Sequence, residues 1–116
     1  MEGNTLDSNL NPSSDTKTHI MLYKAFPDIG GIVHTHSRFA TAWAQSKKSI
    51  TCLGTTHADY FYDEIPCTGI IKDEQIARDY EEETGRLIIE TFKNKKFRLP
   101  SYESMSCCIT WTIYLG

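Results

Sequence analysis

Two histidines spaced by two residues, His34 and His36, are the side chains in this sequence best suited to hold a metal ion. They end the run Gly30-Gly31-Ile32-Val33-His34-Thr35-His36-Ser37, whose apolar residues favour a β-strand. Side chains at i and i+2 of a strand point to the same side, so both imidazoles would face one ion while Thr35 faces away. Catalytic zinc usually takes three protein ligands, so a further one is needed. The alternative is a pair of half-buried polar residues at a strand end, and spacing alone does not decide between the two.

A second group of functional side chains lies in the run Gly54-Thr55-Thr56-His57-Ala58-Asp59-Tyr60-Phe61-Tyr62. Segments that combine threonine, histidine, aspartate and tyrosine often carry chemistry. Asp59 could act as a general acid or base. His57 could orient Asp59 or bind substrate, but a structural contact with backbone groups is the simpler interpretation. Tyr60 and Tyr62 are most simply aromatic residues of a core or an interface.

The elements expected to position these residues alternate between helices and short strands. N-cap residues and apolar periodicity predict three helices, which begin at the caps Asp15, Ser37 and Asp73 and extend to about residues 26, 46 and 94. Short strands are expected at residues 32–36 and 50–53, and an irregular segment at residues 55–62. Glu81 falls in the acidic run of the third helix, where the default interpretation is a hydrated helix face.

The size and charge of the chain limit its possible functions. With 116 residues, 40% of them hydrophobic, the sequence can build one domain and no second one. A net charge of −3 provides no basic surface for nucleic acid. No stretch has the length of a membrane span and the first twenty residues have no signal-peptide core, so a cytoplasmic location is expected. The four cysteines have no Cys-x-x-Cys spacing, which favours buried thiols over a zinc site or disulfides.

Several motifs, in this order and spacing, resemble the L-ribulose-5-phosphate 4-epimerase family. They are the run Asn11-Pro12-Ser13-Ser14-Asp15-Thr16, the two runs quoted above, Tyr80-Glu81 and Glu83-Thr84-Gly85. The resemblance extends without gaps from about Glu2 to Phe92 and places the chain in the wider class II aldolase and adducin head superfamily. It implies an α/β fold, here a partial three-layer α/β/α domain around a largely antiparallel sheet. It also implies a homotetramer with sites at subunit boundaries.

The resemblance assigns roles at a metal and phosphate site. His34 and His36 match two histidine ligands of one Zn²⁺ ion, and Asp15 matches a carboxylate at the metal. Ser13 and Ser14 match part of the substrate phosphate site. This is physically reasonable because free backbone N–H groups at the start of a helix bind anions.

The remaining matches concern proton transfer. Asp59 matches an acid/base residue, Thr55 and Glu81 match positions near the active centre, and His57 is a possible neighbour. The implied reaction converts L-ribulose 5-phosphate to D-xylulose 5-phosphate by cleaving and remaking a carbon–carbon bond, with zinc as the Lewis acid. This sugar-phosphate chemistry belongs to arabinose or ascorbate breakdown, and the sequence does not distinguish the two.

The resemblance covers only part of the family pattern. Residues 1–97 are expected to form a partial class II aldolase/adducin-type domain, and residues 98–116 have no recognisable counterpart. Codons for residues 106–115 read one nucleotide later can encode Leu-Val-Ala-Ser-His-Gly-Pro-Phe-Thr-Trp, which resembles the segment with the family's third zinc histidine. The tail is therefore interpreted as translated out of frame. The family's N-terminal substrate loops and its C-terminal acid/base tyrosine also have no counterpart here, so this chain alone is expected to be inactive.

Two other functions stay open at this point. A class II sugar-phosphate aldolase, a lyase, would cleave its substrate and release both pieces, but such enzymes usually carry glutamate where this chain has Asp15. A non-catalytic interaction module like the adducin head would lack the metal residues, and His34 and His36 argue against it.

Overall fold

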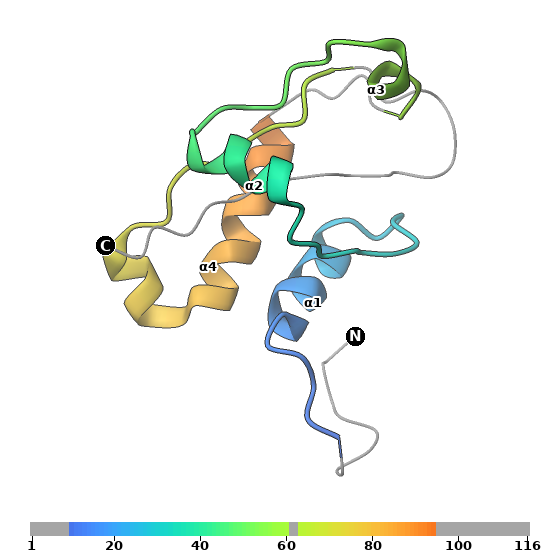
Figure 1. Cartoon of the computed structure of the whole chain (residues 1–116). Helices are drawn as coiled ribbons and strands as arrows, with labels where there is room; N and C mark the ends of the chain where they lie inside the picture. Colours follow the sequence, from blue (N-terminus) through green and yellow to red (C-terminus); the bar gives the residue numbers. More distant parts are fainter. Residues whose placement is uncertain (1–9, 61–62, 95–116) are drawn as a thin grey trace.

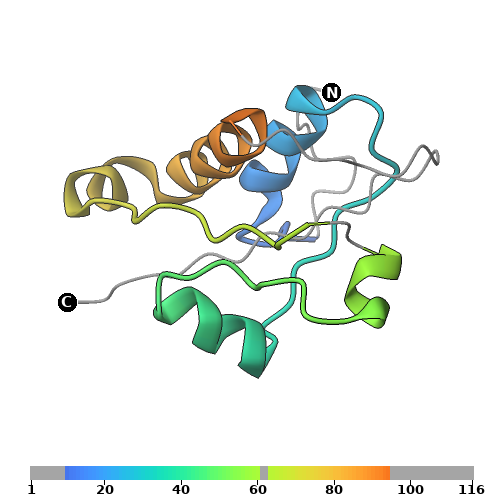
Figure 2. The ribbon, with the colours of Figure 1, turned by 90° about the horizontal axis from the view of Figure 1, so that it is seen from above.

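The structure is a computed structural model that describes residues 10–60 and 63–94. Within these residues the regular elements are four helices: α1 (Thr16–Ala25), α2 (Arg38–Gln45), α3 (Thr55–Tyr60) and α4 (Asp73–Asn94). Helices α1 and α4 pack against each other, and no other pair of these four helices does so (Figure 1). Figure 2 shows α2 and α3 on the other side of the molecule, joined to the α1–α4 pair by segments without regular structure. The expected tail at residues 98–116 and the aromatic residues 61 and 62 lie outside the described part.

The expected α/β domain with a largely antiparallel sheet is wrong for the described part of the chain, which is helical and contains no strand. Residues 32–36 form no ladder, and at residues 50–53 the only pairing is an antiparallel bridge from Ile50 to Ile65, with N···O distances of 2.8 and 2.9 Å. A strand requires hydrogen bonds from a neighbouring chain segment, and β-propensity describes only a side chain that suits such a surface. Val33, in the middle of this segment, is 87% exposed, so no neighbouring strand or helix covers its side chain.

The helix ends largely follow the sequence. Ser37 is the N-cap of α2, as expected, and its Oγ accepts a hydrogen bond from the Ala40 N–H at 3.4 Å. Asp15 occupies the N-cap position of α1, which ends before Pro27, a residue that cannot continue the hydrogen-bond pattern. Asp73 lies in the first turn of α4 and is not its cap.

The segment expected to be irregular contains α3 instead. Its first turn is closed by a hydrogen bond from the Ala58 N–H to the Gly54 carbonyl at 3.0 Å. Such a short helix, with two threonines at its start, has neither apolar periodicity nor high helix propensity for a sequence-based prediction to use.

Helix α4 is interrupted at Asp79, where the backbone is extended with φ −164° and ψ 92°. The Asp79 Oδ1 accepts a hydrogen bond from the Glu82 N–H at 3.1 Å, which is how an N-cap side chain starts a helix. The expected single long helix is therefore two helical segments, the second capped by Asp79.

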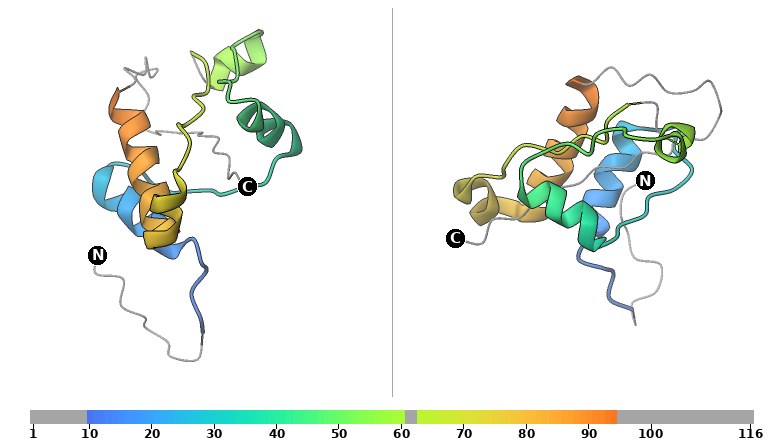
Figure 3. Two further views of the ribbon diagram at one scale, coloured as in Figure 1. Left: turned by 90° about the vertical axis from the view of Figure 1, so that its left-hand side faces the viewer. Right: turned by 45° about the horizontal axis from the view of Figure 1, so that its top comes forward.

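The α1–α4 contact forms the main apolar core of the described residues. Leu22 from α1 and Ile88 from α4 are both buried, and the rings of Phe26 and Phe92 meet edge to face with centroids 5.4 Å apart. Figure 3 shows the two helices side by side in both views. No helix in the described residues has the length and apolar character needed to cross a membrane.

Candidate functional site

The carboxylate of Asp15 and the imidazole of His34 meet directly. His34 Nδ1 donates a hydrogen bond to Asp15 Oδ2 at 2.9 Å, with side-chain exposures of 21% for His34 and 41% for Asp15. The His36 ring lies beside that of His34, with centroids 4.8 Å apart and planes inclined by 38°. Asp15 is held at the start of α1, and both histidines come from the segment between α1 and α2. Three residues that the sequence predicted at one site are therefore neighbours.

The backbone at the start of α1 leaves the Asp15 carboxylate available for this contact. Its side chain makes no capping hydrogen bond to the helix. The Thr16 N–H instead donates to the Ser13 carbonyl at 3.0 Å, and the Asp15 N–H donates to the Ser13 Oγ at 3.3 Å. Ser13 and Ser14 are both exposed at this helix end, so the structure places the two predicted phosphate-binding serines directly before Asp15.

The donor types at this place suit zinc, because imidazole nitrogen and carboxylate oxygen are both common ligands of this ion. Their arrangement is incomplete. In residues 10–60 and 63–94, no group of three histidine, cysteine, aspartate or glutamate side chains is arranged to hold a metal ion. The donor atoms are therefore of the types that zinc prefers. They are too few, and not arranged closely enough around one point, to form a complete zinc site.

The predicted acid/base residue is not part of this group. Asp59 is exposed on α3, together with Thr55, and α3 packs against none of the other described helices. His57 donates from Nε2 to the Asp63 carbonyl at 3.0 Å, which is the structural backbone contact considered from the sequence. The structure therefore does not bring α3 to Asp15 and the two histidines within the described chain.

Glu81 lies at the interruption of α4, facing the first turn of α1. Its backbone carbonyl accepts a hydrogen bond from Thr18 Oγ1 at 2.8 Å, and Thr18 is only 5% exposed. This hydrogen bond joins Thr18, three residues after Asp15, to Glu81, the predicted active-site neighbour. It places the Glu81 backbone in the contact between α1 and α4, which the acidic run around Glu81 does not predict.

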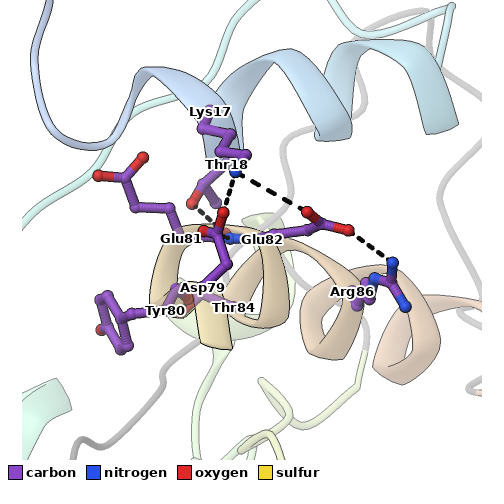
Figure 4. A network of polar contacts seen from close by, with 8 residues as sticks. All are labelled: Lys17, Thr18, Asp79, Tyr80, Glu81, Glu82, Thr84 and Arg86. Atoms are coloured by element: carbon purple, nitrogen blue, oxygen red, sulfur yellow. Dashed lines mark hydrogen bonds and ion pairs between the residues drawn. The ribbon is translucent and has the colours of Figure 1, made fainter. Parts of the chain in front are cut away.

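A surface ion-pair network surrounds that hydrogen bond (Figure 4). Lys17 pairs with Asp79 and lies 3.8 Å from a carboxylate oxygen of Glu82, which also pairs with Arg86 at 2.5 Å. The hydrogen bond from Lys17 lowers the pKa of Asp79 and raises that of Lys17. Both side chains are well exposed, so this pairing contributes little to overall stability.

Sequence reasoning missed the roles of Lys17, Thr18 and Asp79. A signal for Asp79 was present, because Asp79-Tyr80-Glu81-Glu82 has the Asp-x-x-Glu spacing found at helix starts. This spacing lies inside a long segment with helical apolar periodicity, which by itself predicts one continuous helix. Thr18 carries no comparable signal, since its partner is distant in the sequence.

Residues 1–99 match the class II aldolase and adducin N-terminal domain family, and the chain belongs to this family. Proteins of this family are generally metal-dependent. Over 91 residues the chain is 53% identical to proteins named L-ribulose-5-phosphate 4-epimerase UlaF from Salmonella paratyphi B, Salmonella paratyphi C and Salmonella typhi. These matches cover 78% of this chain and 40% of each relative, so the chain spans about two fifths of their length. The family resemblance inferred from the motifs is confirmed.

Proposed function

We propose that this chain is part of a zinc-dependent L-ribulose-5-phosphate 4-epimerase, which interconverts L-ribulose 5-phosphate and D-xylulose 5-phosphate. The observation that carries the proposal is the 53% identity over 91 residues to proteins of that name. The contact between Asp15 and His34, with His36 beside them, supports it because a carboxylate and two imidazoles gather where the family resemblance places a metal.

The substrate determines the type of reaction. In a 2-ketopentose phosphate, C4 is not adjacent to the carbonyl, so its hydrogen is not acidic and simple deprotonation cannot invert this centre. Cleavage of the C3–C4 bond, rotation of the aldehyde fragment and re-addition on its other face achieve the inversion. A zinc ion held by His34, His36 and Asp15 would supply Lewis-acid stabilisation of the negative charge that develops on cleavage.

The proposed roles of the protein residues follow from their chemistry. Asp59 exchanges a proton with the C4 oxygen on one face, and the family's C-terminal tyrosine, which has no counterpart in this chain, would do so on the opposite face. Ser13 and Ser14 hold the phosphate, helped by the positive end of the α1 dipole. Thr55, His57 and Glu81 line the active centre without direct proton transfer.

Assembly would bring the separate parts of the site together. We propose a homotetramer, and large apolar side chains exposed on the described surface support an interface: Leu10, Val33, Phe39 and Leu53, all more than two thirds exposed. Contacts between subunits would explain why α3, with Asp59, packs against no other described helix of its own chain. We also place the enzyme in the cytoplasm, and the free thiol of Cys67 is consistent with a reducing compartment.

We propose further that residues 98–116 are translated out of frame and replace the segment with the third zinc histidine. Resequencing the coding DNA tests this proposal directly. A corrected frame that encodes a His-Gly-Pro segment supports it. An uninterrupted gene that encodes Trp111-Thr112-Ile113-Tyr114, with no family-like downstream frame, contradicts it.

Product analysis on the frame-corrected, full-length protein tests the function. An epimerase forms D-xylulose 5-phosphate from L-ribulose 5-phosphate, and it loses this activity in the His36→Ala and Asp59→Asn variants. An accumulation of the two cleavage fragments would instead indicate an aldolase. A protein that binds no zinc and turns over neither sugar phosphate would indicate a non-catalytic module.

A further inference from the structure

The start of α1 is fixed to the interruption of α4 by two adjacent residues of α1. Thr18 donates its hydroxyl hydrogen to the Glu81 carbonyl at 2.8 Å, and Lys17 pairs with the Asp79 carboxylate. Figure 4 shows both α1 side chains directed at the turn of α4 that contains Asp79, Glu81 and Glu82. We call Lys17, Thr18 and Asp79 the α1–α4 clasp.

The interruption of α4 lies next to this contact. The extended backbone at Asp79 begins a new helical segment, and Glu81 lies in the first turn of that segment. The Asp79 carboxylate has two functions there, because Oδ1 caps the new segment through the Glu82 N–H at 3.1 Å while Oδ2 pairs with Lys17.

The clasp lies one turn from the candidate metal site. Asp15 immediately precedes the first turn of α1, and its carboxylate has no capping bond to hold it in place. Its position relative to His34 therefore depends on where the first turn of α1 lies. Thr18, three residues later, is the buried anchor of that turn.

We propose that the α1–α4 clasp is a positioning device: Lys17, Thr18 and Asp79 fix the first turn of α1 so that Asp15 meets His34, and they hold Glu81 beside the same turn. The assignment of Asp15 and His34 to the active centre rests on the proposed function. The positioning itself is a property of the chain, and it does not require bound metal or turnover.

The test uses the ¹⁵N chemical shift of His34 Nδ1 in the full 116-residue chain at a fixed neutral pH, without added metal. The Asp15→Asn variant gives the reference value, namely the His34 Nδ1 chemical shift when the hydrogen bond between residue 15 and His34 is weakened. Thr18→Val, which keeps the shape but removes the hydroxyl, moves the His34 signal at least halfway toward that value, whereas Thr18→Ser restores the wild-type shift. Lys17→Met and Asp79→Asn remove the ion pair between two exposed side chains and shift the signal in the same direction. They remain informative if Thr18→Val fails to fold.

The matched control is Thr91→Val. Thr91 also donates its hydroxyl hydrogen to a carbonyl, that of Leu87 at 2.7 Å, but this bond lies within α4 and away from the clasp. The proposal is overturned if the clasp variants leave the His34 signal unchanged, or if Thr91→Val moves it equally. The frame-corrected enzyme could prove inactive while the clasp variants still move the His34 signal as predicted. That result would contradict the proposed function and would still support the positioning role.

Discussion

Replacing Gly85 by alanine tests how closely α1 and α4 approach each other. A Cβ added at Gly85 would lie 3.0 Å from Met21 Sδ, 3.3 Å from Met21 Cε and 3.4 Å from Met21 Cβ. The Met21 sulfur and terminal methyl must give way by a few tenths of an ångström inside the packed α1–α4 contact, whereas Met21 Cβ at 3.4 Å lies at an ordinary van der Waals distance. Overpacking of this kind costs about 1–3 kcal/mol, while alanine gains about 1 kcal/mol over glycine in a helix. We therefore expect Gly85→Ala to lower the free energy of unfolding by about 1 kcal/mol.

A double-mutant cycle isolates this contact. In a Met21→Ala background only the 3.4 Å approach remains, and Gly85→Ala should then stabilise the protein by about 1 kcal/mol, for a coupling of about 2 kcal/mol. Urea unfolding followed by far-UV circular dichroism measures all four proteins. Gly69→Ala is the control, because its new methyl meets only Leu87 Cδ1 at 3.7 Å and should change stability by less than about 0.5 kcal/mol. Equal effects of Gly85→Ala in both backgrounds would refute the close packing of the two helices.

Three further predictions concern charge, a helix cap and a thiol. Because pairing with Lys17 lowers the pKa of Asp79 from its ordinary 3.8, the stability it provides is present above that pH and lost as pH falls through the lowered value. The stability difference between wild type and Asp79→Asn should thus be constant from neutral pH to about pH 5 and shrink in stronger acid; a difference that grows there contradicts the pairing. Ser37→Ala should cost about 1 kcal/mol and Ser37→Asp little, as measured by urea unfolding, and equal losses would exclude a capping role. Burial raises the pKa of the Cys67 thiol, so its alkylation, followed by peptide mass spectrometry, should have a pH midpoint above the ordinary 9.0; a midpoint below it contradicts this burial.

The helices could be predicted where local signals determine them. Pro27 and the Ser37 cap act within one turn, so the end of α1 and the start of α2 could be predicted, and Asp15 occupies the predicted N-cap position of α1 although its side chain makes no capping hydrogen bond. The interruption at Asp79 was missed although the sequence carried its capping pattern. The prediction of strands at residues 32–36 and 50–53 was wrong for a different reason. The sequence of a segment shows whether it suits a strand but does not show whether a partner segment lies beside it.

The candidate site was predictable in part. Spacing alone placed His34 and His36 close together, and their rings are neighbours even without a strand, because residues two apart cannot be far from each other. The contact of Asp15 with His34 came from the family resemblance, as the two residues are far apart in the sequence. The role of Asp59 stays a prediction, because α3 packs against none of the other described helices.

Zinc binding to the frame-corrected, full-length protein tests the central claim most directly, namely that Asp15, His34 and His36 belong to one metal centre. Competition with a chromophoric chelator gives both stoichiometry and affinity. We predict one zinc ion per chain, with affinity reduced at least tenfold in Asp15→Asn and lost in His34→Ala and His36→Ala, whereas His19→Ala, in the middle of α1, binds as the wild type does. Zinc binding that is absent from the unsubstituted frame-corrected protein, or that survives removal of both His34 and His36, would contradict the account.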